Sequence, residues 1–154
     1  MAADLPAAEA PFDAAQVWRA VGETRMALEL VGSRFTDVAG APPLLKLADS
    51  ICAGGVVLGD RISVDDPETL GSTRARLHFD GVEVDRGVAT ACPAGSPLAA
   101  LTWLANHLAS RGKQLRAGDV VISGKICAAP GISPYQRVSA TFEGHGSIES
   151  FFLP

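Results

Sequence analysis

The segment from Ser96 to Gly112 constrains the fold most strongly, because it carries the features of a complete amphipathic helix. Ser96 is a favoured N-cap residue, Pro97 suits the first helical position, and Gly112 suits the position just past the C-terminus. Apolar residues recur on one face between these ends, namely Leu98, Leu101, Ala105 and Leu108. The sequence therefore predicts a helix over 97–111 that lies against a sheet.

Most of the other patterns are those of short strands. The dipeptide Asp80-Gly81, which suits a tight hairpin turn, separates alternating runs at 73–79 and 82–84. An apolar run at 26–31 contains a single carboxylate. Further strands are predicted at 55–59, 119–123, 137–143 and 148–153, and further helices at 14–25 and 44–50. Many strands and two principal helices predict an α+β fold, a curled mixed β-sheet with the helices on the outside.

Composition narrows the class of protein. A chain of 154 residues can bury one core, so we expect a flexible Ala/Pro-rich arm at 1–12 and a single domain at 13–154. The net charge of −4, without a basic cluster, argues against nucleic acid as a partner, and no apolar run is long enough to span a membrane. Three widely spaced cysteines indicate neither a disulfide framework nor a zinc site, so a cytoplasmic location is expected.

Glu29 is the principal chemical candidate, because it lies between Leu28 and Leu30 in a predicted buried strand. Burying an unpaired carboxylate costs on the order of several kcal/mol, so such a group needs a partner. Arg34 would point to the opposite face of a regular strand. Two interpretations remain open: Glu29 binds a metal ion or another cation, or it lies on a solvated or salt-bridged face.

Other polar residues allow a functional and a structural interpretation. Glu83 and Asp85 have the spacing of two carboxylates on one strand face, but beside a hairpin turn we interpret them as a solvated edge. Cys52 could be a nucleophile only with a nearby base, and the three histidines are remote in sequence, so a packing thiol is the simpler interpretation. Lys125 follows Ser123-Gly124 at a predicted strand end, where it is either a pocket cation or acid/base lysine, or an exposed loop residue.

Five blocks of the sequence occur in the order found in one known family. Residues 27–34, Ala-Leu-Glu-Leu-Val-Gly-Ser-Arg, resemble the Ala-Leu-Glu-(apolar)2-Asp-Ser-Arg stretch of the 2-hydroxypenta-2,4-dienoate hydratases and the oxalocrotonate decarboxylases, in the fumarylacetoacetate hydrolase superfamily. The other matching blocks are 48–50, 97–106, 115–124 and 144–148. The chain thus resembles the C-terminal part of these enzymes.

This resemblance implies a metal-dependent lyase with the β-roll of the superfamily. By resemblance, Glu29 binds Mg²⁺ or Mn²⁺, and the cation holds a 2-hydroxy-2,4-dienoate or related 2-oxo acid. Ser123 stands where the family has a ligand-facing hydroxyl, and a hydroxyl that stabilises the turn is an equally simple interpretation. Ser50 and Cys52 stand in the family's Asp-Asn-Ala-Ser stretch, on the substrate side of the pocket. Lys125 is a candidate acid/base residue at the same site.

The family's upstream Glu-x-Glu pair and acid/base residues have no counterpart in the 154 residues. Activity therefore requires ligands from elsewhere, and we expect a homo-oligomer or a partner chain that supplies them. Two alternatives stay open. The chain is a non-catalytic or repurposed form of the fold that serves as a binding or assembly subunit, or it is a fragment of a longer hydratase.

Overall fold

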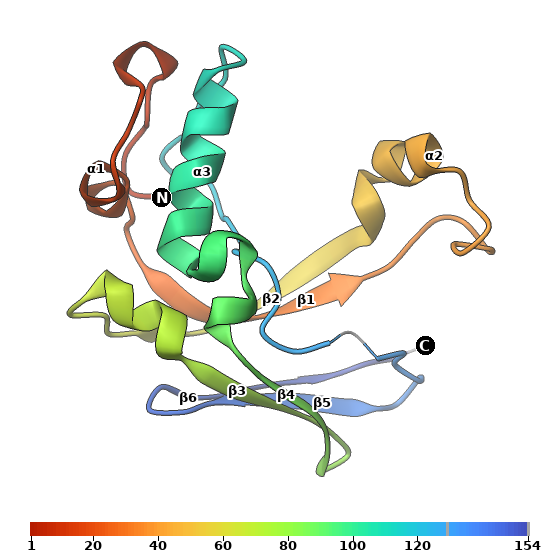
Figure 1. Cartoon of the computed structure of the whole chain (residues 1–154). Helices are drawn as coiled ribbons and strands as arrows, with labels where there is room; N and C mark the ends of the chain where they lie inside the picture. Colours follow the sequence, from red (N-terminus) through yellow and green to blue (C-terminus); the bar gives the residue numbers. More distant parts are fainter. Residues whose placement is uncertain (129, 154) are drawn as a thin grey trace.

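The computed structural model describes residues 1–128 and 130–153. Figure 1 shows a helical layer on one side, a four-stranded sheet on the other, and a two-stranded ribbon between them. The ribbon pairs β1 (Thr24–Val31) with β2 (Ala53–Ile62). The four-stranded sheet has the order β4-β3-β5-β6, with bounds β3 (Arg74–Phe79), β4 (Val82–Val88), β5 (Arg137–Phe142) and β6 (Gly146–Phe151). The helices are α1 (Ala14–Arg19), α2 (Pro43–Ala48) and α3 (Pro97–Ala109).

The α+β class is confirmed, but the mixture of parallel and antiparallel strands is not found. Every pairing between the named strands is antiparallel. For two of the pairings the reason is local: short turns join β3 to β4 and β5 to β6, and a short turn can only reverse the chain. Asp80 and Gly81 form the first of these turns with φ of 51° and 82°, as the hairpin prediction requires.

Helix α3 begins at Pro97 as predicted, and the Ser96 hydroxyl accepts the Ala99 N–H at 3.3 Å. Helix α1 has the predicted capping box of Asp13 and Gln16 but ends at Arg19, six residues earlier than expected. It ends early because the chain turns there to enter β1, where Thr24 already pairs with Ile62 of β2. None of the described helices is long and apolar enough to cross a membrane.

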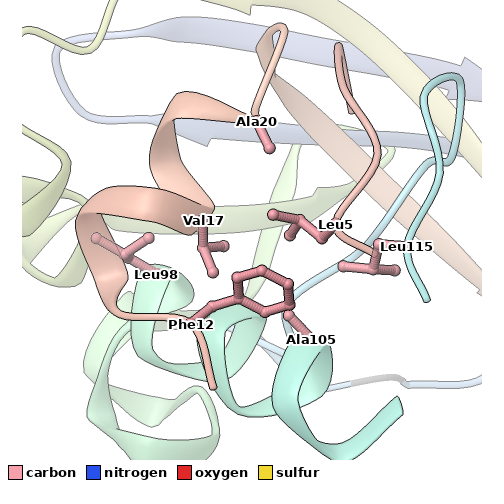
Figure 2. Packing of buried hydrophobic residues seen from close by; sticks show 7 residues of the cluster. All are labelled: Leu5, Phe12, Val17, Ala20, Leu98, Ala105 and Leu115. Atoms are coloured by element: carbon pink, nitrogen blue, oxygen red, sulfur yellow. The ribbon is translucent and has the colours of Figure 1, made fainter. Parts of the chain in front are cut away.

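The first twelve residues differ from the flexible arm that their composition predicted. Leu5 pairs with Leu115, and the backbone of Phe12 bonds to the Asn106 amide of α3. Both Leu5 and Phe12 are buried in the core between α1 and α3, which Figure 2 shows from close by. The core residues drawn there are Leu5, Phe12, Val17, Ala20, Leu98, Ala105 and Leu115.

A second core lies on the inner face of the four-stranded sheet. Its buried residues are Met26, Leu77, Phe79, Val138, Ala140 and Ile148. Residues 119–123 were predicted as a strand and form none. They belong instead to an irregular segment, residues 118–128, which we call the cleft loop and which passes between the helical layer and the sheet (Figure 1, cyan to blue). The prediction failed because no neighbouring strand pairs with this backbone.

Candidate active-site cleft

A cleft of about 990 Å³ lies between the two cores. Its walls are β1, the cleft loop and the start of α3, and its floor is the apolar inner face of the four-stranded sheet, including Leu77 and Ala140. The polar residues that line it include Glu29 from β1 and Ser123 and Lys125 from the cleft loop, beside the charged residues Glu23, Arg25, Arg61 and Asp119. An apolar cleft with a few convergent polar groups is the usual form of a small-molecule site.

Glu29 is exposed rather than buried between its leucine neighbours. In β1 it stands opposite Val56 of β2. Among residues 1–128 and 130–153, no lysine or arginine lies within ion-pair distance of its carboxylate. The interpretation of a solvated face is therefore the one that the structure supports, and the carboxylate remains available to a ligand in the cleft.

The buried carboxylate is that of Asp49, which the residue patterns alone did not single out. It is 5% exposed at the end of α2. The Ser33 hydroxyl donates to it at 2.6 Å, and Arg34 adds its backbone N–H at 3.2 Å and its Nε at 2.6 Å. The Ser33 hydroxyl in particular, together with the N–H and charge of Arg34, holds the pKa of Asp49 below its usual value. Arg34 therefore compensates Asp49, not Glu29.

Ser50 and Cys52 do not line the cleft. They lie in a short 3₁₀ turn, Ser50–Cys52, between α2 and β2, with positive φ of 56° and 67°. Figure 1 shows this turn and α2 at the far end of the β1–β2 ribbon. The ribbon carries them away from the cleft loop, because β1 and β2 extend for eight and ten residues before the chain reaches α2. The structure thus brings Glu29, Ser123 and Lys125 together and leaves Ser50 and Cys52 apart.

Two cysteines line the cleft that the sequence patterns left without a role, Cys92 and Cys127. Burial raises the pKa of the Cys92 thiol, and a hydrogen bond with the Ser123 hydroxyl only partly offsets this. Burial also raises the pKa of Cys127, and the nearby charges of Asp85 and Glu83 raise it further. Both thiols are therefore protonated at neutral pH, which makes them poor nucleophiles.

The described residues do not form a complete metal site. Within 1–128 and 130–153, no group of three or more His, Cys, Asp or Glu side chains is arranged to hold a metal ion. Mg²⁺ requires about six oxygen ligands in octahedral geometry, and it often keeps several waters. Glu29 can contribute one carboxylate, so a complete site would need ligands beyond those that one copy of the described residues brings together.

No protein-family model matches the chain, whereas the curated relatives include hydratases and a decarboxylase. The chain is similar to the TodF product hydratase of Pseudomonas putida, with 33% identity over 143 residues, covering 90% of this chain and 51% of the relative. It is also similar to the 2-keto-4-pentenoate hydratase of Paraburkholderia xenovorans, with 32% identity over 137 residues, covering 89% and 50%. The chain spans about half the length of the curated relatives it matches.

Comparison with solved structures finds proteins with the same fold, and one of them is again a decarboxylase. The 4-oxalocrotonate decarboxylase from Pseudomonas putida G7, complexed with magnesium and adipate, superimposes with a TM-score of 0.85 at 25% identity, covering 99% of this chain and 56% of that one. A fumarylacetoacetate hydrolase family protein from Yersinia pestis shares the fold, with a TM-score of 0.68 at 14% identity, covering 99% of this chain and 68% of that one. The chain is therefore similar, over about half of their length, to the 2-keto-4-pentenoate hydratases and to a 4-oxalocrotonate decarboxylase, and it shares the fold of that decarboxylase.

Proposed function

We propose that this chain forms part of the active site of a hydratase-like lyase that acts on a 2-hydroxy-2,4-dienoate or a related 2-oxo acid. One observation carries the proposal: Glu29 of β1 and Ser123 and Lys125 of the cleft loop, two segments far apart in the sequence, line the same cleft. The apolar floor suits the hydrocarbon part of a dienoate, and the Lys125 ammonium suits its carboxylate. The relatives named 2-keto-4-pentenoate hydratase support the substrate class.

The proposed cofactor is a divalent cation, Mg²⁺ or Mn²⁺, with Glu29 as one ligand. A solved relative that is complexed with magnesium supports this assignment. A bound cation supplies Lewis-acid stabilisation to oxygen atoms of a 2-oxo acid. Because Glu29 alone cannot complete such a site, we propose that a second copy, a partner chain or a further segment of the polypeptide supplies the other ligands. Free cysteines support a reducing, cytoplasmic location.

The proposal is tested with Glu29→Gln, which keeps the size of the side chain and removes its charge. We expect kcat/KM for hydration of 2-hydroxypenta-2,4-dienoate with Mg²⁺ to fall by about 100-fold or more, since loss of residues that merely support metal ligands costs about 10–100-fold. Glu149→Gln is the matched control, because Glu149 is an exposed carboxylate on β6 that does not line the cleft. Calorimetric titration of both variants with Mg²⁺ and Mn²⁺ measures cation binding directly.

A second candidate function is a non-catalytic binding or assembly subunit. The incomplete ligand set among the described residues favours it. Hydration that depends on Glu29 rejects this candidate. Absence of both turnover and cation binding, in the chain and in any complex that it forms, rejects the lyase instead. Light scattering after size exclusion tests the expected self-association, and a purely monomeric chain contradicts that expectation.

A further inference from the structure

The cleft loop is anchored on β4, on a face that the sequence suggested was a solvated edge. Glu83, Asp85 and Gly87 alternate along this strand and are half-buried, while the residues between them are exposed or nearly so. Asp85 stands opposite Leu77, which belongs to the core of the sheet. Asp85 and Gly87, which stands opposite the buried Ala75, therefore share the inner face of the sheet, whereas a register shift places Glu83 opposite His78.

Asp85 makes the polar contact between strand and loop. Its Oδ2 accepts the N–H of Ala128 at 2.5 Å. That N–H, followed by the N–H of Arg86 and the charge of Lys125, holds the pKa of Asp85 below its usual value. The carboxylate is thus ionised at neutral pH and forms a charge-assisted hydrogen bond, which is stronger than a neutral one.

Gly87 makes the steric contact. A Cβ added to Gly87 would lie 1.8 Å from the Ile126 carbonyl oxygen, so the loop backbone rests directly on the strand at this point. The thiol of Cys127 donates to the Ala75 carbonyl on β3 at 3.7 Å. On the other side of Lys125, Gly124 has φ of 82°, and a Cβ there would lie 2.6 Å from Pro93.

Lys125 therefore lies between two close contacts of the loop backbone, one with the Pro93 ring and one with Gly87, while its own side chain stays exposed in the cleft. Among the described residues, Asp85 is the β4 side chain that forms a hydrogen bond with the cleft loop, whereas Glu83 pairs with Arg76 and Arg86. Loss of the Asp85 contact would release the loop at Ala128, three residues from Lys125. The ammonium would then sample a wider range of positions.

We propose that Asp85 is a positioning residue, which anchors the cleft loop at Ala128 and so holds Lys125 where it binds the carboxylate of a 2-oxo acid. The role of Lys125 in this statement rests on the proposed function. Two possible roles of Asp85 predict opposite effects of its removal on the binding of an anion. If Asp85 acted only through its charge, removing it would strengthen anion binding. If it acts as an anchor, removing it weakens binding.

The test compares Asp85→Ala, Asp85→Asn and Lys125→Ala in the full chain. Hydrogen exchange of the Ala128 amide reports the anchor without any ligand, and NMR titration with pyruvate, a short 2-oxo acid, reports binding. Asp37→Ala is the control: Asp37 also accepts a backbone N–H, from Gly40 at 2.9 Å, but does not line the cleft. Thermal unfolding of each variant verifies that it is folded.

We expect Asp85→Ala to raise Ala128 exchange and to weaken pyruvate binding, each by about ten-fold or more, the scale of a lost charge-assisted hydrogen bond. Asp85→Asn should have a smaller effect, because its amide oxygen still accepts the N–H. Lys125→Ala should weaken binding without changing exchange. A protein that combines Asp85→Ala with Lys125→Ala should lose little more binding than either single variant. Asp37→Ala should change neither measurement.

If the Ala128 amide exchanges at the same rate in Asp85→Ala as in the unaltered chain, Asp85 does not anchor the loop, whatever the pyruvate titration shows. Raised exchange with unchanged or tighter pyruvate binding overturns the link to Lys125. If the unaltered chain binds no pyruvate while Ala128 exchange depends on Asp85, the proposed function and the role of Lys125 fail and the anchor alone survives. The two failures are therefore distinguishable.

Discussion

Asp49 shows how one side chain can join two segments that lie far apart in the sequence. Its carboxylate, at the end of α2, receives the Ser33 hydroxyl and the Arg34 backbone N–H from the chain that follows β1. Almost all of the Asp49 side chain is removed from solvent, whereas the Arg34 side chain is 76% exposed. The contact thus closes the loop between β1 and α2. Because the Arg34 side chain stays largely in solvent, its charge is not desolvated.

The lowered pKa of Asp49 predicts an acid-dependent contribution to stability. Since the folded pKa lies below the unfolded value, the contribution is complete above the unfolded value of about 4 and is lost as the pH falls through the folded pKa. Asp49→Asn should remove this part of the pH dependence below about pH 4 while lowering stability at pH 7. Urea denaturation from pH 2 to pH 7 measures both effects. A variant whose acid dependence matched that of the unaltered chain would contradict the assignment.

At the scale of elements, α3 holds the helical layer together, because it packs against α1 and bonds to the N-terminal segment. Asn106 on α3 accepts the Phe12 N–H at 2.7 Å and donates to the Phe12 carbonyl at 2.9 Å. It completes its bonds with the Thr102 carbonyl at 3.1 Å in its own helix. One amide side chain thus ties the N-terminal segment to α3 by a two-way pairing.

Asn106→Ala should loosen the N-terminal segment without unfolding α3. We expect a loss of about 1–3 kcal/mol in the free energy of unfolding, because the Phe12 N–H and carbonyl lose their partner in a half-buried position. Limited proteolysis between residues 1 and 12 should become faster. Asn106→Asp is the informative companion, since it keeps the acceptor and loses the donor. Equal proteolysis of all three proteins would show that Asn106 does not hold this segment.

At the scale of the whole molecule, the cleft separates two cores that the chain connects several times. The chain enters β1 from the helical layer, returns to α3 after β4, and crosses again along the cleft loop to β5 (Figure 1). Trp18 and Trp103, the two tryptophans, both lie in the helical layer. Ile148 is 5% exposed in the core of the sheet.

These crossings predict that the two cores unfold together. Ile148→Ala should lower the free energy of unfolding by about 2–5 kcal/mol, as expected for a large side chain truncated in a core. Tryptophan fluorescence reports the helical layer and far-ultraviolet circular dichroism reports the whole chain, so both midpoints should fall equally. A fluorescence midpoint that stayed in place would show two independently unfolding layers.

Local chemistry accounts for what could be predicted from the sequence alone. The helix that starts at Pro97, the Asp80-Gly81 hairpin and the capping box at Asp13 depend on contacts within a few residues, and all three are present. The blocks of family residues likewise pointed to Glu29 and Ser123, and Lys125 was a candidate from its position directly after one block; all three line one cleft.

Only the tertiary structure decided how residues far apart in the chain meet. A sequence pattern does not reveal that Arg34 forms an ion pair with Asp49. It also does not reveal that residues 119–123 pair with no described strand, or that the ribbon places Ser50 and Cys52 away from the cleft. The same holds for Leu5 and Phe12, whose burial depends on α3, about 90 residues further along the chain. Burial and pairing are properties of the packed chain, and short-range propensity does not contain them.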